Sequence, residues 1–153
     1  MAVFNSLAIS TGAPVPGVGM GGGQRRAQYT KVTLPVGATT TDTINLFRIP
    51  ISARITGLAV KYPAFGGATT LIIGDAGFTQ PDGTVLAADP DRYFAAGSIA
   101  TAGSSTAIAL TGLFLLGPRN RFLTITAQLA AGTVATAGDL EVALFFTVEE
   151  PQV

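Results

Sequence analysis

Apolar and polar residues alternate along several short stretches of the chain. In residues 28–36, Val32 and Leu34 share one face, while the residues between them occupy the other. Leu144 and Phe146 repeat the pattern near the C-terminal end. A period of two is typical of a β-strand that buries one face. We therefore predict seven or eight short strands, the clearest at residues 28–36, 43–49, 54–62, 69–73, 106–116, 122–129 and 140–148.

Turn-forming residues separate these stretches. Gly66-Gly67, Pro81-Asp82-Gly83 and Gly138-Asp139 combine Gly, Pro and Asp where tight turns need them. Many short strands with such turns favour an all-β fold, a jelly-roll-like antiparallel β-sandwich, over a parallel sheet covered by helices. No stretch has sustained helical periodicity, and residues 89–96 are the one candidate for a short helical turn.

The first 27 residues differ in character from the rest. Prolines and a glycine-rich run within residues 13–23 disfavour both a helix and a central strand. Apolar residues ahead of this run, among them Phe4 and Leu7, could pair or dock with another surface. We predict an extended Gly/Pro-rich N-terminal arm over residues 1–27 and a β-sandwich domain over residues 28–153. The first ten residues contain no lysine or arginine and do not resemble a secretory signal.

The composition of the 153 residues limits the classes of partner. Hydrophobic residues make up 48% and charged residues 12%, about half the usual charged share. So few charges protect a free monomer poorly against association, which favours burial of the surface in an assembly. Nine basic and nine acidic residues leave no net charge, so neither nucleic acid nor an anionic membrane is an expected partner. The uncharged run 93–118 is interrupted by glycines and fits a strand pair better than a transmembrane helix.

Catalytic chemistry is restricted by the residue types that the chain lacks. The absence of histidine and cysteine excludes Ser–His and Cys–His nucleophiles, disulfides and cysteine metal sites. Residues 17–22 satisfy the GxGxxG spacing, but prolines precede them and no strand–turn–helix context is predicted, so nucleotide binding is not expected. We predict no catalytic residues and a protein that is not an enzyme.

Acidic residues in the middle of the chain are the one candidate for a metal site. Asp82, Asp89 and Asp91 could supply oxygen ligands to calcium. Alternatively, Asp82 forms a turn with Gly83, while Asp89 and Asp91 flank Pro90 and cap a short helix. The spacing is not that of an EF-hand, so we favour the second interpretation and predict no metal or other cofactor. Paired carboxylates also occur in glycosidases, but the chain has no tryptophan and three tyrosines for a sugar platform.

The scarce positive charges mark candidate contacts with partners. Arginine is favoured at protein interfaces because its planar fork can make several hydrogen bonds at once. For any one arginine, a solvated loop charge is the alternative interpretation. The predicted partner-binding residues are Phe4, Leu7, Arg25, Arg26, Arg119 and Arg121.

Two parts of the chain resemble small virion proteins of tailed bacteriophages. Residues 48–55, with the sequence RIPISARI, are similar to the LPxxARI strand entry of those proteins. Residues 73–75 and 87–103 together resemble their IGxA…ADPDRYL…S…AAG arrangement. The chain departs from the simplest pattern by an insertion of residues 76–86.

The resemblance implies a head decoration (cement) protein. Such proteins are commonly jelly rolls or related β-sandwiches, often homotrimers, that sit on the outer capsid surface where major capsid protein subunits meet. The resemblance thus implies synthesis in the host bacterial cytoplasm, a final location on the virion, and the major capsid protein and further copies of the chain as partners. It offers no catalytic residues.

Two other functions fit the same patterns. One is a tail or neck structural component. The other is a carbohydrate-binding β-sandwich module at the virion surface, which needs aromatic side chains on an exposed face. The aromatic residues available for that face are Tyr62, Phe65, Phe78, Tyr93 and Phe94, and core packing is the favoured interpretation for them.

Overall fold

The structure, a computed structural model, describes residues 3–5, 25–50, 53–106 and 122–148. Within these ranges every regular element is a β-strand. The strands are β1 (Val3–Asn5), β2 (Arg25–Leu34), β3 (Thr43–Ile49), β4 (Ala53–Tyr62), β5 (Thr70–Asp75), β6 (Phe78–Thr79), β7 (Val85–Leu86), β8 (Asp89–Ser98), β9 (Gly103–Ser105), β10 (Leu123–Ala131) and β11 (Gly138–Val148). No helix in the described part of the chain is long and apolar enough to cross a membrane.

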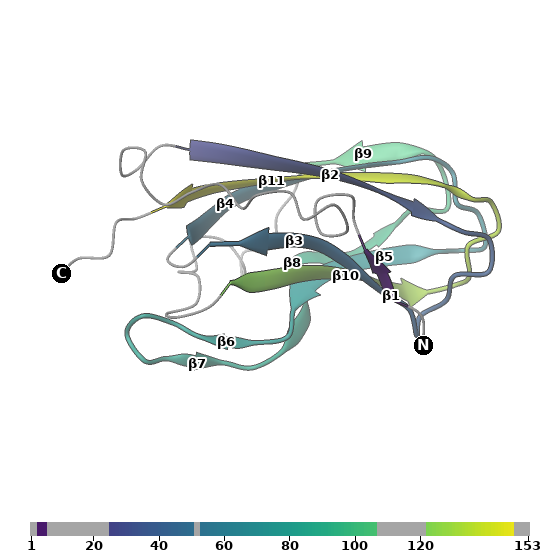
Figure 1. Ribbon diagram of the computed structural model, residues 1–153. Coiled ribbons are helices and arrows are strands. Elements are labelled where there is room, and N and C mark those ends of the chain that lie inside the picture. The colour runs from purple at the N-terminus through teal and green to yellow at the C-terminus, as the bar shows by residue number, and fades with distance from the viewer. Residues whose placement is uncertain (1–2, 6–24, 51–52, 107–121, 149–153) are drawn as a thin grey trace.

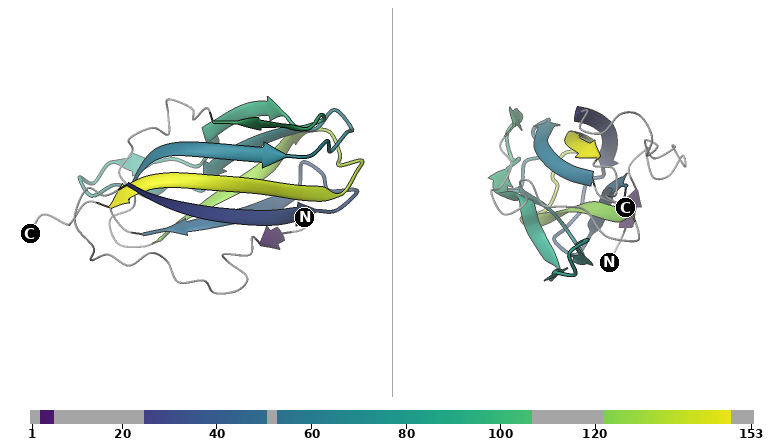
Figure 2. Two further views of the ribbon diagram at one scale, coloured as in Figure 1. Left: turned by 90° about the horizontal axis from the view of Figure 1, so that it is seen from above. Right: turned by 90° about the vertical axis from the view of Figure 1, so that its left-hand side faces the viewer.

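The strands form two main sheets that face each other (Figure 1; two further views in Figure 2). The order is β1-β3-β10-β5-β8 in the five-stranded sheet and β2-β11-β4-β9 in the four-stranded sheet. Neighbouring strands are antiparallel, except that β1 runs parallel to β3. The fold is therefore a jelly-roll-like antiparallel β-sandwich, which confirms the predicted fold class.

Strand alternation places the core between the two sheets. In β11, Leu140, Val142, Leu144 and Phe146 are buried, while the residues between them are partly exposed. Each large aliphatic or aromatic side chain buried in this way stabilises the fold by about 1.5–3 kcal/mol. Because successive side chains of a strand point to opposite faces, the period of two in the sequence is enough to fix which face is buried.

Most of the predicted strands are found close to their predicted bounds. β3 has the predicted range, and β2 begins three residues earlier than the predicted strand at 28–36. The strand predicted at 106–116 lies almost wholly outside the described residues. So does most of the predicted arm, which therefore stays a prediction, although Val3–Asn5 pair in parallel with β3 of the same chain.

The helical turn considered for residues 89–96 is wrong, because these residues belong to the ten-residue strand β8. β8 pairs with β5 at the edge of the five-stranded sheet. Proline lacks the N–H that a central strand needs for hydrogen bonds to both of its neighbours. An edge strand makes such bonds on one side only. Pro90 is therefore compatible with a strand at this position.

One end of the sandwich is closed by loops that connect the two sheets, and three of these loops are bonded together through Phe65. The side chain of Phe65 is fully buried there. Its N–H donates to the carbonyl of Ile99 at 3.1 Å, and its carbonyl accepts from the N–H groups of Ala135 at 2.9 Å and Thr136 at 3.1 Å. These bonds join the β4–β5, β8–β9 and β10–β11 loops into one unit.

β6 and β7 form a separate two-stranded hairpin, drawn below the five-stranded sheet in Figure 1. The pairs are Phe78 with Leu86 and Thr79 with Val85. The insertion noted in the sequence at residues 76–86 is this hairpin. An isolated two-stranded hairpin is marginally stable in water, so its position depends on how it is attached to the sandwich.

Candidate functional site

A buried polar cluster lies where the hairpin meets the five-stranded sheet. On β5, Leu71, Ile73 and Asp75 follow one another on the inner face, so the alternation carries a carboxylate into the core. Asp75 is 3% exposed. A charged group is buried at a tolerable cost only when it is paired and hydrogen-bonded, so its partners decide whether this position is stable.

Three hydrogen bonds satisfy the Asp75 carboxylate. Oδ2 accepts from Nε of Arg92 at 2.8 Å and from the hydroxyl of Tyr93 at 2.8 Å. Oδ1 accepts from the N–H of Gly77 at 2.8 Å. Arg92 is 7% exposed and Tyr93 is fully buried. The cluster Asp75–Arg92–Tyr93 therefore joins the end of β5 to β8 within the interior.

Arg92 also connects the cluster to the hairpin. One terminal nitrogen donates to the carbonyl of Ala87, directly after β7. The guanidinium lies 6.0 Å from the centre of the Phe78 ring on β6 and 3.8 Å from a carboxylate oxygen of Asp89. The side chain of Phe78 is itself buried at 3% exposure. Both strands of the hairpin are thus held at their base by one arginine.

The hairpin tip is a compact turn. The N–H of Gln80 donates to the carbonyl of Thr84 at 2.8 Å, and the N–H of Thr84 donates to Oδ1 of Asp82 at 2.9 Å. This hydrogen bonding lowers the pKa of Asp82 from its ordinary value. Next to the tip, the side chain of Val85 is 75% exposed. These two bonds hold the tip in a compact turn.

The cluster predicts a specific loss of stability at alkaline pH. Burial, with a smaller contribution from the Asp75 carboxylate, raises the pKa of the Tyr93 hydroxyl far above its ordinary value. In the unfolded chain the phenol loses its proton near pH 10, roughly its ordinary pKa. The folded chain keeps that proton, so the contribution of Tyr93 is complete below pH ~10 and declines above it.

Tyr93→Phe tests this contribution. The difference in unfolding free energy between the wild type and Tyr93→Phe should be constant up to pH ~10 and then shrink by at most about 1.4 kcal/mol per pH unit. Urea unfolding followed by circular dichroism between pH 8 and 11.5 measures it. A difference that stays constant to pH 11.5 would contradict the burial of a protonated Tyr93.

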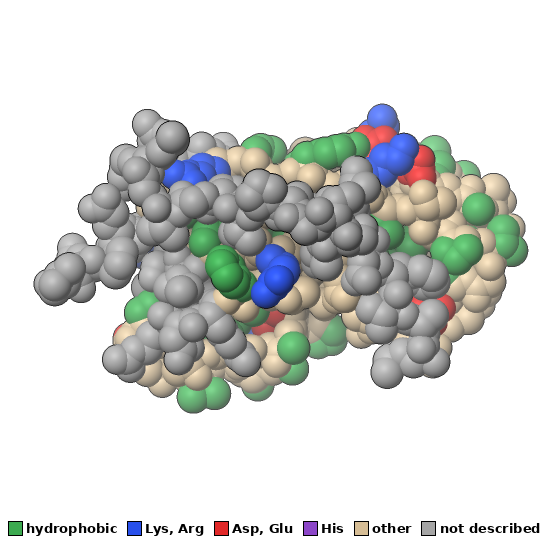
Figure 3. Space-filling model, in the orientation of Figure 1, with side chains coloured by type: hydrophobic (Ala, Val, Ile, Leu, Met, Phe, Trp, Pro, Cys, Tyr) green, Lys and Arg blue, Asp and Glu red, His purple; other side chains and the backbone are tan. Residues whose placement is uncertain are grey.

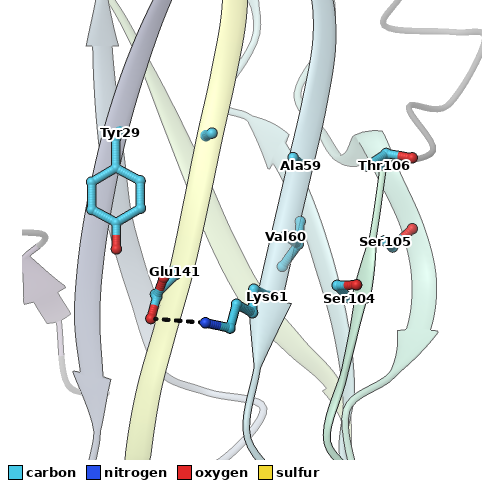
Figure 4. A pocket seen from close by; sticks show the side chains of 9 residues that line it. Tyr29, Ala59, Val60, Lys61, Ser104, Ser105, Thr106 and Glu141 are labelled. Carbon is cyan, nitrogen blue, oxygen red and sulfur yellow. Dashed lines mark ion pairs between the residues drawn. The ribbon is translucent and has the colours of Figure 1, made fainter.

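A shallow groove of about 160 Å³ crosses the outer face of the four-stranded sheet (Figure 4). Its floor is formed by Ala59 and Ala143, which are paired across β4 and β11. Tyr29, 58% exposed, lies on one side. At one end Lys61 and Glu141 form an exposed ion pair at 3.8 Å. Figure 3 shows acidic and basic side chains gathered at the upper edge of the molecule, over this sheet.

The chemistry of this groove is weak. A hydrogen bond with Glu141 raises the pKa of the Tyr29 hydroxyl, so that hydroxyl is already used within the chain. Exposed ion pairs contribute little to stability, and Lys31–Asp139 at 2.6 Å beside the groove is another of this kind. The groove is shallow, and its polar groups already bond to one another. It therefore does not offer buried groups that point toward a ligand.

The predicted partner-binding residues lie only partly within the described structure, so this set stays a prediction. Phe4 lies on β1 opposite Ile44, and Arg25 and Arg26 begin β2. Leu7, Arg119 and Arg121 lie outside the described residues.

The calcium candidates do not assemble into a site. Asp82 lies at the hairpin tip, where it binds the N–H of Thr84. Oδ1 of Asp89 accepts from the N–H of Asp91 at 3.3 Å. Among the residues that the structure describes, no group of three or more His, Cys, Asp or Glu side chains is placed to hold a metal ion. The turn-forming interpretation is correct for Asp82, and Asp89 and Asp91 begin a strand instead of capping a helix.

The aromatic residues considered for a sugar platform pack inside the protein. The exposed fractions are 0% for Phe65 and Tyr93, 3% for Phe78 and 7% for Phe94, and Tyr62 is partly buried against the core. The core-packing interpretation of these residues is confirmed. An exposed Phe122, with Arg48 5.4 Å from its ring centre, was not singled out from the sequence.

The Asp75–Arg92–Tyr93 cluster was also missed as a unit. Its residues are within the segments that resemble phage virion proteins, but a motif does not state which side chains meet. The available signal was the phase of β5, since Asp75 follows Leu71 and Ile73 on the apolar face. All three polar groups are buried, and Arg92 and Tyr93 both bond to Asp75, so the cluster can hold the hairpin but presents no reactive group to a substrate.

Comparison with solved structures identifies two similar chains in phage particles. One, in the capsid of Ralstonia phage GP4, aligns with a TM-score of 0.75 and 19% identity over 97% of this chain and 99% of that chain. Another, in the capsid asymmetric unit of cyanophage Pam1, aligns with a TM-score of 0.63 and 26% identity over 90% of this chain and 95% of that chain. No family model and no curated protein sequence matches the chain.

Both alignments cover nearly all of each chain, so the similar chains are close to this one in length. The class defined by the fold is a small jelly-roll-like β-sandwich of the kind found in these phage capsids.

Proposed function

We propose that the protein is a virion structural protein of a tailed bacteriophage, a decoration (cement) protein that binds the outside of the head and stabilises contacts between major capsid protein subunits. The observation that carries this proposal is the end-to-end similarity to chains of phage capsids, at 26% identity for cyanophage Pam1. A whole-chain match favours the same type of building block, rather than a shared subdomain of a larger protein.

The physical character of the chain supports a structural role rather than catalysis. The sequence contains no histidine or cysteine, and the best-defined polar cluster is buried and satisfied internally. A sandwich closed at one end by bonded loops is a rigid body. Repeated over a shell, a modest contact made by each copy adds up to a large stabilisation of the whole particle.

The proposed partners are the major capsid protein and further copies of the chain, arranged as a homotrimer on the outer capsid surface. The N-terminal arm, with Phe4, Leu7, Arg25 and Arg26, is part of this proposal, as are Arg119 and Arg121. The parallel pairing of β1 with β3 is consistent with such an arm, because a short segment added to a sheet edge binds through backbone hydrogen bonds.

The alternatives receive less support. A tail or neck component is disfavoured because both similar chains belong to capsids. A carbohydrate-binding module is disfavoured because four of its five candidate aromatic side chains are buried.

Localisation and add-back together test the proposal. Antibodies against the purified protein, detected with gold by electron microscopy, should label the head surface of the parent particle. Heads that lack the protein should release DNA at a lower temperature than complete heads, and added purified protein should restore the release temperature.

The controls separate the alternatives. Heat-denatured protein should restore nothing, because the contact requires the folded sandwich. Label confined to the tail or neck would support the tail component instead. Heads that neither bind the protein nor change their release temperature would refute the cement function.

A further inference from the structure

We infer that the hairpin formed by residues 76–88 is the element that docks onto a capsid subunit, at a surface where an apolar patch is bordered by lysine or arginine side chains. This inference rests on the proposed function and adds the contact element and the chemistry of the partner surface. Three features of the hairpin carry it: its attachment, its exposed side chains and its charge.

The attachment makes the hairpin a rigid projection. Arg92 contacts the ring of Phe78 on β6 and the carbonyl of Ala87, the residue directly after β7. Arg92 is in turn held by Asp75, which also bonds the N–H of Gly77 where the hairpin begins. A buried charged cluster is a costly way to fix a short surface loop. This cost is explained if the hairpin is a docking element, because a rigid element loses little conformational entropy on binding.

The hairpin exposes apolar side chains. Among the large hydrophobic residues of the described structure, Val85 is the most exposed at 75%. Ala76, Ala87, Ala88 and Pro90 nearby are also exposed. Figure 3 shows hydrophobic side chains along the lower margin of the molecule, where Figure 1 places β6 and β7. Scattered single apolar residues need no explanation, but a group of them on a projecting element favours a protein contact.

The charge of this region is one-sided although the whole chain is neutral. Residues 75–92 contain four of the nine acidic residues and only one of the nine basic residues, Arg92. Within this segment Arg92 is buried and paired with Asp75, so the charges that reach the surface are those of Asp82, Asp91 and, in part, Asp89, which lies 3.8 Å from Arg92. Hydrogen bonding from Asp91 to Asp89 raises the pKa of Asp91.

An apolar projection with an acidic border fits a partner surface of opposite character. An apolar patch would cover Val85, and lysine or arginine side chains around it would complement Asp82 and Asp91. A basic border would also steer the encounter and fix the orientation of the docked protein. The groove on the opposite sheet also exposes an apolar side chain, Tyr29, but its charges are not one-sided, because they form ion pairs within the chain.

Three variants of the full-length chain test the docking element by equilibrium binding to heads that lack the protein. Val85→Arg should weaken binding at least tenfold, at both low and high salt. Asp91→Lys should weaken binding several-fold in 50 mM salt, and this effect should disappear in 500 mM salt because the charges are screened. Tyr29→Arg is the matched control: it places the same charge at an exposed site on the other sheet and should change binding less than twofold.

The outcomes separate this inference from the proposed function. If Val85→Arg and Asp91→Lys bind the heads as tightly as the wild type does, the hairpin assignment is overturned and the cement function stays intact. No binding by the wild type would remove both. If Val85→Arg instead disrupts self-association, measured by mass photometry, the hairpin contacts a second copy and the capsid assignment is wrong. Melting curves of the variants that match the wild type exclude misfolding as the cause.

Discussion

Replacing Asp75 by alanine should cost about 3–5 kcal/mol of unfolding free energy, which is the usual cost of removing one partner of a buried ion pair. The substitution removes the acceptor for Arg92 Nε, the Tyr93 hydroxyl and the Gly77 N–H at once. It leaves a cation that is 7% exposed without its closest carboxylate. Because a domain is typically stable by roughly 5–15 kcal/mol, this loss would be a large part of the total.

Urea unfolding followed by circular dichroism measures the loss. Asp82→Ala is the matched control, since Asp82 is exposed and accepts one bond from the Thr84 N–H; it should cost far less than Asp75→Ala. If both substitutions cost the same, the buried cluster does not stabilise the sandwich.

A double variant shows how much of the destabilisation comes from an unpaired buried charge, rather than from the loss of a packed side chain. Arg92→Met alone should also be strongly destabilising, because it leaves the Asp75 carboxylate buried without its cation. Asp75→Leu combined with Arg92→Met removes both charges and should cost clearly less than the sum of Asp75→Leu alone and Arg92→Met alone. Additive costs would mean that the two side chains act independently, in conflict with their 2.8 Å contact.

The sandwich could be predicted because its strands obey a local rule. β11 buries every second residue from Leu140 to Val148 and leaves those between partly exposed, so the sequence alone is enough to locate it. β8 could not be predicted, because Pro90 and the aspartates on either side of it are typical of turns, and only the pairing with β5 makes them a strand. β9, formed by Gly-Ser-Ser, has no apolar residue that would reveal it.

The candidate site could be predicted less well, because it depends on contacts between distant residues. Asp75 meets Arg92 and Tyr93, which are 17 and 18 residues further along the chain. The hairpin lies between them, and nothing in its sequence states that it closes back at this point. The period of two places Asp75 on the inner face, but it does not identify which cation pairs with the buried carboxylate.

The closed end of the sandwich gives the second large prediction, which concerns a close approach of two backbones. Gly67 has a φ of +60°, and a Cβ added there would lie 2.0 Å from the carbonyl oxygen of Thr133. At Gly132 a Cβ would lie 2.4 Å from the carbonyl oxygen of Gly67. The two loops therefore cross where only glycine fits, and they are the loops bonded through Phe65.

Gly67→Ala should cost about 2–5 kcal/mol: about 1–2 kcal/mol for a side chain at positive φ and about 1–3 kcal/mol for the forced shift of the packed loops. Gly83→Ala is the matched control, because Gly83 also has a positive φ, +91°, but no atom lies within 4 Å of an added Cβ. It should show the cost of the backbone conformation alone, about 1–2 kcal/mol.

Thermal and urea unfolding of both variants measure the difference. Equal costs would mean that the loops can separate without loss, and the closed end would then not be the rigid part of the sandwich. A larger cost for Gly67→Ala would locate a substantial part of the stability in the loops that join the two sheets, at the end where Phe65 is buried.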